Sequence, residues 1–163
     1  MKTTHIRNII VFVLFSMLST PFLFSQKAGE SAQGMTSVTT SRGSGDARSF
    51  IVSSINNHGY YHNSFKWKLK ASFEGSYLGI VPYNPQNNKV KEETMYCDFS
   101  NLYTSGNVDV RSNNLAFINI YVASSRNINK KKWKKEKLVI RVDNPEIAKS
   151  LLDAFQDLNR SLR

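Results

Sequence analysis

Between residues 65 and 73, apolar side chains alternate strictly with polar ones, and this alternation constrains the fold more than any other feature of the chain. The apolar positions are Phe65, Trp67, Leu69, Ala71 and Phe73, and the positions between them are Lys66, Lys68, Lys70 and Ser72. Because successive side chains of a β-strand point to opposite faces, this period predicts a strand with one apolar and one cationic face. Residues 64–73 are therefore predicted to form a strand that buries one face.

Turn-forming residues and further apolar runs predict an antiparallel sheet around this strand. Gly75 and Ser76 form a hairpin-type turn, and a second strand is predicted to return over residues 77–83. Residues 98–103 are predicted to form a helical turn, and Asn113 with Asn114 a turn between strands. The remaining strands are predicted at residues 91–97, 107–111, 115–123 and 137–142.

Two helices are predicted to flank these strands. The first covers residues 47–58, with Asp46 as its N-cap and Gly59 in the left-handed position after its last turn. Asp143 or Asn144 is predicted to cap a second helix that begins at Pro145. That helix carries one apolar stripe, formed by Ile147, Leu151, Phe155 and Leu158. Since only the inner face of the sheet is large enough to cover the stripe, the helix is predicted to pack on the sheet.

This element order resembles a pleckstrin-homology-like (PH-like) barrel, in which meandering strands are followed by one C-terminal helix. The resemblance covers residues 64–162 and rests on element order and on the junction Asp143-Asn144-Pro145-Glu146. With its preceding helix, the chain also resembles small exported bacterial domains of unassigned function. The predicted class is α+β, mainly β: an antiparallel PH-like barrel or strongly curved sheet of about six to seven strands. The amphipathic C-terminal helix packs on it, and a short helix precedes the first strand. The alternative is an open sheet with both helices on one face.

The first residues have the three parts of a secretory signal. Lys2 and Arg7 give a positive start, residues 9–15 are apolar without interruption, and Ser25 offers a small residue for cleavage after Pro21. We therefore predict a signal peptide at residues 1–25, a polar linker at 26–45 and one PH-like domain at 46–163. The predicted location is periplasmic or extracellular, and no transmembrane span is predicted in the mature chain.

Cys97 is the only cysteine, which excludes an internal disulfide and a cysteine-based zinc finger. It is predicted to be a small buried residue of a strand rather than a reactive thiol.

No catalytic constellation stands out, so a non-catalytic protein without cofactor or metal is predicted. The chain has no nucleophile-elbow, Walker or dinucleotide-binding motif. His58 and His62 have the i, i+4 spacing of helical metal ligands, but Gly59 ends the predicted helix between them and no Asp or Glu adjoins. Glu92 and Glu93 are predicted on a strand, where neighbouring side chains point to opposite faces and form no acid/base pair. A small metal-dependent enzyme using His58 and His62 is kept as an alternative.

A basic segment concentrates the positive charge of the chain. Residues 126–141 carry eight cations and one anion, a net charge of +7, whereas the chain after the signal peptide carries 20 cations and 12 anions. Such a local positive potential favours an anionic partner. The predicted binding residues are Arg126, Lys130, Lys131, Lys132, Trp133, Lys134, Lys135 and Lys137. In the alternative interpretation, the lysines are a solvated hairpin that keeps a strand edge from pairing, and Trp133 packs inward.

Phosphoinositide binding, known from PH domains, is not carried over to this chain. Lys66, Lys68 and Lys70 match the first half of that basic signature, but residues 77–81 lack Arg and Lys and the Gly75-Ser76 turn is short. The predicted function is an exported, non-catalytic binding or interaction domain. Its partner is an unknown envelope or secreted protein, or an anionic lipid or polysaccharide, and nucleic acid is the least favoured partner. A purely structural component of an envelope assembly, joined through an exposed strand edge, is a further alternative.

Overall fold

The computed structural model describes residues 44–111, 114–130 and 132–163. The signal peptide predicted at residues 1–25 and nearly all of the linker predicted at 26–45 lie outside these residues, as does Lys131. Among the residues that are described, no helix combines the length and the apolar character needed to cross a membrane.

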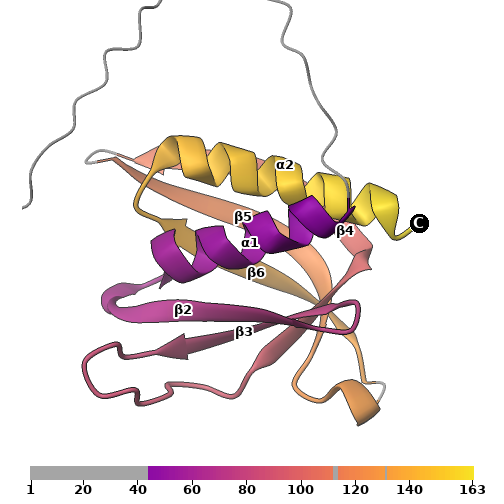
Figure 1. Ribbon diagram of the computed structural model, residues 1–163, viewed down its shortest axis with the longest axis horizontal. Coiled ribbons are helices and arrows are strands. Elements are labelled where there is room, and N and C mark those ends of the chain that lie inside the picture. The colour runs from indigo at the N-terminus through magenta and orange to yellow at the C-terminus, as the bar shows by residue number, and fades with distance from the viewer. Residues whose placement is uncertain (1–43, 112–113, 131) are drawn as a thin grey trace, which may run out of the picture. The chain divides into compact units, whose positions relative to one another are not determined.

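Two helices and six strands make up the described part of the chain (Figure 1). In chain order they are α1 (Ser44–His58), β1 (Gly59–Tyr61), β2 (Ser64–Glu74), β3 (Tyr77–Tyr83), β4 (Met95–Arg111), β5 (Leu115–Ser125), β6 (Lys134–Val142) and α2 (Pro145–Ser161), with a short 3-10 helix, η1 (Ile128–Lys130), before β6. The α+β class, the predominance of β-structure and the two flanking helices are therefore confirmed.

Each strand pairs antiparallel with its neighbour in the chain, and the order of strands closes on itself. The closing strand is β1, which pairs with β2 on one side and with Ile140–Val142 of β6 on the other. This pairing distinguishes the fold from the open sheet that was the alternative prediction. The two helices do lie side by side, as that alternative required (Figure 1).

The core lies between the two helices and the inner face of the strands. Leu151, Phe155 and Leu158 of α2 are fully buried, as the apolar stripe predicted. The ring of Phe155 stacks on that of Phe99 in β4, with 4.8 Å between the ring centres. Burial of each large apolar side chain contributes about 1.5–3 kcal/mol, so this contact fixes the C-terminal helix on the strands. From α1, Ile51 and Ile55 join the same core.

The strand with the clearest alternation forms as predicted. β2 buries Leu69 and Ala71 and leaves Lys66 and Lys70 exposed. At its outer end the pattern departs from the prediction, because the side chain of Phe65 is 51% exposed. The Gly75 turn is also confirmed: Gly75 has a φ of 60°, a conformation that glycine adopts without steric cost.

The helical turn predicted at residues 98–103 is wrong, because β4 runs through it and joins the strand predicted at 107–111 to the end of the strand predicted at 91–97. The physical reason is a series of irregularities in its pairing with β5, between residues 98 and 108, which breaks the two-residue period. At the first of them, the Asp98 carboxylate accepts hydrogen bonds from the backbone N–H and hydroxyl of Ser100. This local bonding is typical of turns, and so the sequence pattern here mimics one. Residues 91–94 of the strand predicted at 91–97 lie outside β4.

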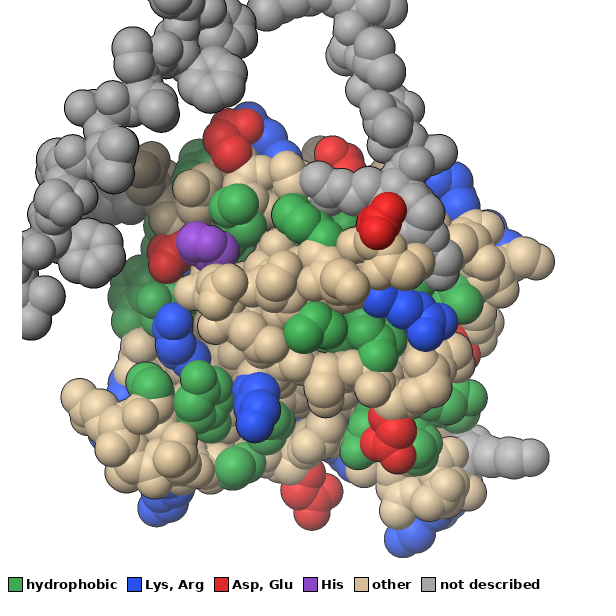
Figure 2. Space-filling view, viewed as in Figure 1, with side chains coloured by type: hydrophobic (Ala, Val, Ile, Leu, Met, Phe, Trp, Pro, Cys, Tyr) green, Lys and Arg blue, Asp and Glu red, His purple; other side chains and the backbone are tan. Residues whose placement is uncertain are grey.

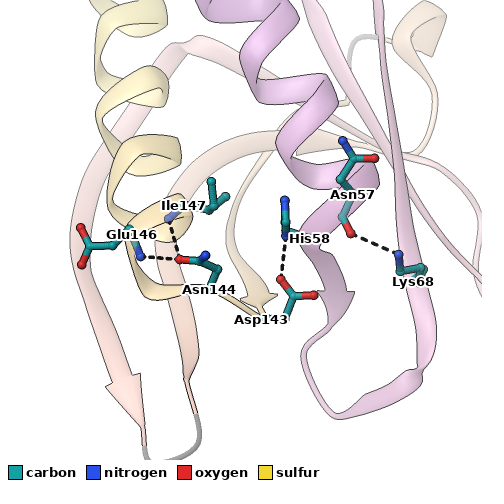
Figure 3. A network of polar contacts seen from close by, with 7 residues as sticks. All are labelled: Asn57, His58, Lys68, Asp143, Asn144, Glu146 and Ile147. Carbon is teal, nitrogen blue, oxygen red and sulfur yellow. Dashed lines mark hydrogen bonds and ion pairs between the residues drawn. The ribbon is translucent and has the colours of Figure 1, made fainter. Parts of the chain in front are cut away.

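The ends of the helices differ in part from their predictions. Asp46 is not the N-cap of α1, because the helix begins at Ser44 and Asp46 lies in its first turn. Gly59 is not left-handed and instead begins β1. A Cβ at position 59 would lie 2.5 Å from the Ile55 carbonyl oxygen, so close packing explains the glycine. At α2, Asn144 is the N-cap: its side-chain oxygen accepts from two backbone N–H groups of the first turn (Figure 3).

Candidate functional site

The basic segment covers the β5–β6 connection and nearly all of β6, and its lysines lie in the connection and the first half of the strand. Five of its lysines are exposed, and no acidic side chain forms an ion pair with any of them in the described part of the chain. They are Lys130, Lys132, Lys134, Lys135 and Lys137. Their charges are therefore available to an external anion. The face that α1 and β2 present differs, because its Lys and Arg side chains occur singly among uncharged ones (Figure 2).

Aromatic side chains accompany these lysines on the outer surface. The Lys135 ammonium group lies 5.1 Å from the ring centre of Tyr103 and 5.6 Å from that of Tyr121. Tyr103 and Tyr121 are both exposed. Trp133 lies elsewhere: it is half-buried, and its ring packs against Tyr77 with 4.8 Å between ring centres. Of the two predictions made for Trp133, the packed conformation is the one observed.

Arg126 differs from the lysines because its side chain binds groups of the protein itself, which come from the segment before β4. Its guanidinium donates a 2.7 Å hydrogen bond to the Glu93 carbonyl oxygen and lies 3.9 Å from a carboxylate oxygen of Glu92. Glu92 and Glu93 were predicted on a strand, which is wrong: they lie in the irregular segment before β4. The other Glu92 oxygen accepts a 2.5 Å hydrogen bond from the Tyr61 hydroxyl. This bond is the main cause that raises the pKa of Tyr61 above its usual value, with burial as the second.

A cavity of about 350 Å³ lies beside these groups. Its apolar wall is formed by the buried side chains of Leu69, Ile80 and Leu138. Glu92, Arg126 and Glu136 provide polar groups at the same cavity. The volume falls at the small end of the range for ligand pockets, about 300–1,000 Å³.

The cavity borders an edge of β6 that no strand covers. β5 pairs with β6 from Lys134 to Val142, but β1 pairs only with Ile140–Val142 on the opposite edge. Among the described residues, no strand pairs with that opposite edge between Lys134 and Val139. Residues 136–139, which belong to both faces of β6, all line the cavity, so the cavity lies along the strand edge.

The acidic side chains next to this edge, Glu92 and Glu136, already have partners inside the protein. Glu136 accepts a 2.6 Å hydrogen bond from the Ser124 hydroxyl.

Burial raises the pKa of the Cys97 thiol to about 12, and the charge of Glu136 adds to the increase. Cys97 is fully buried in β4, as predicted. Its thiol is therefore protonated and inert at neutral pH.

His58 and His62 occupy different environments. His58 ends α1, and its Nδ1 lies 2.8 Å from Asp143, at the end of β6 (Figure 3). Asp143 is distant from His58 in sequence but adjacent in the fold, so spacing along the chain could not reveal this contact. His62 follows β1, packs on Tyr61 and lines the cavity. The described residues hold no group of three or more His, Cys, Asp or Glu side chains that is placed to bind a metal.

Arg141, the last cation of the basic segment, packs on the surface of the strands. Its guanidinium lies 3.3 Å from the ring centre of Phe65, which explains why an exposed phenylalanine is stable at that position. Burial lowers the pKa of Arg141. Tyr60 contacts Phe65 edge-on, with 5.1 Å between ring centres. Arg141 therefore belongs to a packed cluster and is not one of the free surface cations.

Sequence reasoning named Arg126, Lys137 and His62 as candidates but missed the contacts that join the groups around the cavity. Tyr61 and Glu92 are 31 residues apart, and Arg126 and Glu93 are 33 apart, so no local spacing joins them. The only signal in the sequence was the pair of adjacent glutamates, which carries no information about a partner. Comparison with protein-family models, with curated proteins and with solved structures finds no match for this chain.

Proposed function

We propose that this chain is an exported, non-catalytic binding domain of PH-like barrel architecture that contacts an anionic partner through its basic segment. The single observation that carries the proposal is the set of five exposed lysines without ion pairs in the described structure, gathered between residues 130 and 137. Elsewhere on the described surface, Arg111 binds Asp109, Lys149 binds Glu146 and Arg160 binds Asp157. Lys66, Lys70 and Lys89 are also exposed without an ion pair, so what distinguishes the basic segment is the density of such lysines.

The exposed lysines act together because their electrostatic contributions to binding add up. Each lysine close to an anionic surface contributes about 1 kcal/mol, and the contribution decreases over a Debye length of about 8–10 Å. Lys132, Lys134 and Lys135 are close enough in the chain to act on one partner together. The exposed rings of Tyr103 and Tyr121 next to Lys135 add an apolar contact area. The closed antiparallel strands and the C-terminal helix support the PH-like architecture.

The test is a charge reversal with a matched control. The variant combines Lys132→Glu, Lys134→Glu and Lys135→Glu. The control combines Lys66→Glu, Lys70→Glu and Lys89→Glu, which reverses the same charge at three other exposed lysines. Binding to polyglutamate and to vesicles that contain phosphatidylglycerol is measured at low and high salt.

We expect the first variant to bind at least tenfold more weakly than the wild type at low salt and the control to lose much less. Both should unfold in urea at concentrations close to that of the wild type, because exposed charges contribute little to stability. Equal losses in the two variants would show that only net charge matters. If neither variant lost affinity, the basic segment would have no role in binding.

A further inference from the structure

In the described structure, the uncovered edge of β6 indicates how a partner binds, an inference that rests on the proposed function. In an antiparallel pair, alternate residues direct their backbone N–H and C=O groups away from the neighbouring strand. Between Lys134 and Val139, these groups point to the edge that β1 leaves unpaired. Such an edge is a template for an added strand. Here the edge opens on the cavity of about 350 Å³.

The two faces of this edge select different side chains. On the outer face, Lys135 and Lys137 are exposed and have no ion pair in the described structure. On the cavity face, Leu138 is buried and lies with Leu69 and Ile80 along the apolar wall. Residues of an added strand alternate between the same two faces. The outer positions therefore favour acidic side chains and the cavity positions favour apolar ones.

The charges at the cavity strengthen this selection. Glu92 is held by Tyr61 and lies near Arg126, and Glu136 is held by Ser124. Arg126 also lines the cavity, but it lies 3.9 Å from Glu92 and offsets that charge, so a carboxylate that entered the cavity would be repelled mainly by Glu136. Acidic residues of a partner are thus favoured on the outer face, next to Lys135 and Lys137.

We infer that the β6 edge from Lys134 to Val139 accepts an extended segment of a partner protein, in which acidic and apolar residues alternate. The segment adds a strand next to β6, places an apolar side chain in the cavity and pairs its carboxylates with the outer lysines. A second copy of this chain does not suit the edge, because antiparallel pairing of β6 with itself would set lysines opposite lysines. A lipid or polysaccharide surface offers no backbone groups for the edge.

The probe is an eight-residue peptide with blocked ends in which valine and glutamate alternate. Its affinity is measured by fluorescence anisotropy, and hydrogen exchange of the backbone amides of β6 is followed by nuclear magnetic resonance. Three comparison peptides are used. Two carry N-methyl groups on every second backbone amide, one in each of the two possible phases, and the third contains only glutamate and glycine at the same total charge.

We expect the alternating peptide to bind and to slow the exchange of alternate amides between residues 134 and 139. Methylation in one phase should weaken binding at least tenfold, because it removes donors to the edge, whereas the other phase should have a smaller effect. The glutamate–glycine peptide should bind more weakly, since nothing fills the cavity. Lys135→Glu combined with Lys137→Glu should weaken binding of the alternating peptide at least tenfold.

Failure of this inference is distinguishable from failure of the proposed function. If polyglutamate or vesicles bind through the lysines but both methylated peptides bind as well as the parent, the strand-addition model is wrong and the cationic surface stands. Absence of peptide binding, unchanged amide exchange, or self-association that protects the same amides would also overturn the inference. If the lysine reversals leave every affinity unchanged, the proposed function fails as well.

Discussion

The Nδ1 atom of His58 lies 2.8 Å from Oδ1 of Asp143, which joins the last residue of α1 to the residue before the N-cap of α2 (Figure 3). A backbone hydrogen bond accompanies this contact, from the Asp143 N–H to the His58 carbonyl oxygen at 3.3 Å. The two helices are thus connected at one end of the core through residues 85 positions apart. The side chains are 37% and 38% exposed, so solvent screens much of their attraction.

We predict that the His58–Asp143 contact contributes little to stability. In a double-mutant cycle with His58→Ala and Asp143→Ala, the coupling energy should be about 0.2–1 kcal/mol and should decrease with added salt. Urea denaturation of the four proteins measures it. A coupling above about 2 kcal/mol would mean that the pair is shielded from solvent to a degree its exposure does not indicate.

A second prediction concerns the close packing at Gly59. Gly59→Ala would place a Cβ 2.5 Å from the Ile55 carbonyl oxygen, a backbone atom that cannot move without disturbing α1. We expect a loss of about 1–3 kcal/mol in the free energy of unfolding. The matched control is Gly45→Ala in α1, whose Cβ would meet nothing within 4 Å.

Since alanine is the better helix former, Gly45→Ala should leave stability unchanged or raise it by up to about 1 kcal/mol. Thermal and urea denaturation of both variants provide the comparison. Equal effects at the two positions would show that the close approach at the α1–β1 junction does not determine the stability of Gly59→Ala.

Local patterns predicted the parts of the fold that depend on neighbouring residues. The alternation in residues 65–73 predicted β2, and the stripe through Leu151 and Phe155 predicted α2, because each is a contiguous amphipathic surface. The closing strand β1 was not predicted. It has only three residues, too few for a period, and it exists because β2 and β6 offer it partners on both sides. Its shortness leaves the β6 edge and its cavity uncovered.

The candidate site likewise has one part that local sequence predicts and one part that depends on contacts between distant residues. The lysines were found because they are dense in the sequence, and their exposure follows from the position of β6. The contact of Tyr61 with Glu92 depends instead on the closure of the strands, which brings β1 next to the segment before β4. The role of Arg126 also depended on this closure, since its partners are Glu92 and Glu93.

A third prediction follows from the Tyr61–Glu92 hydrogen bond. Because this bond is the main cause of the raised pKa of Tyr61, Glu92→Ala should lower that pKa toward the usual value of about 10. The charge of Arg126 acts in the opposite direction and lowers the pKa of Tyr61, so Arg126→Met should raise it. The test is specific because substitutions at two residues that are neighbours in the fold should shift the pKa of Tyr61 in opposite directions.

Nuclear magnetic resonance of ring-labelled tyrosine resolves Tyr61 among the seven tyrosines and follows its titration. If both substitutions shift the pKa in the same direction, a general change of burial at the cavity, and not the two charges, controls Tyr61.

The fourth prediction links Cys97 to the alkaline stability of the protein. Burial, with a contribution from Glu136, raises the pKa of the folded thiol from 9.0 to about 12, whereas in the unfolded chain the thiol ionises near its usual value. Between these two values the folded state holds a proton that the unfolded state has lost. The stability that this proton represents is fully present below pH 9 and is lost as the pH rises toward 12, by up to about 1.4 kcal/mol per pH unit.

Cys97→Ala removes this dependence, and the comparison with the wild type isolates it from the raised pKa values of Tyr60, Tyr61 and Tyr96. At neutral pH the variant should be less stable, because it lacks a fully buried sulfur atom. As the pH rises above 9, the difference in the free energy of unfolding should decrease, because only the wild type loses stability through the thiol. Urea denaturation at a series of pH values measures that difference. If the difference in the free energy of unfolding stayed constant up to pH 11, the thiol would ionise equally in the folded and unfolded states. Cys97 would then have to be accessible to solvent in the folded protein.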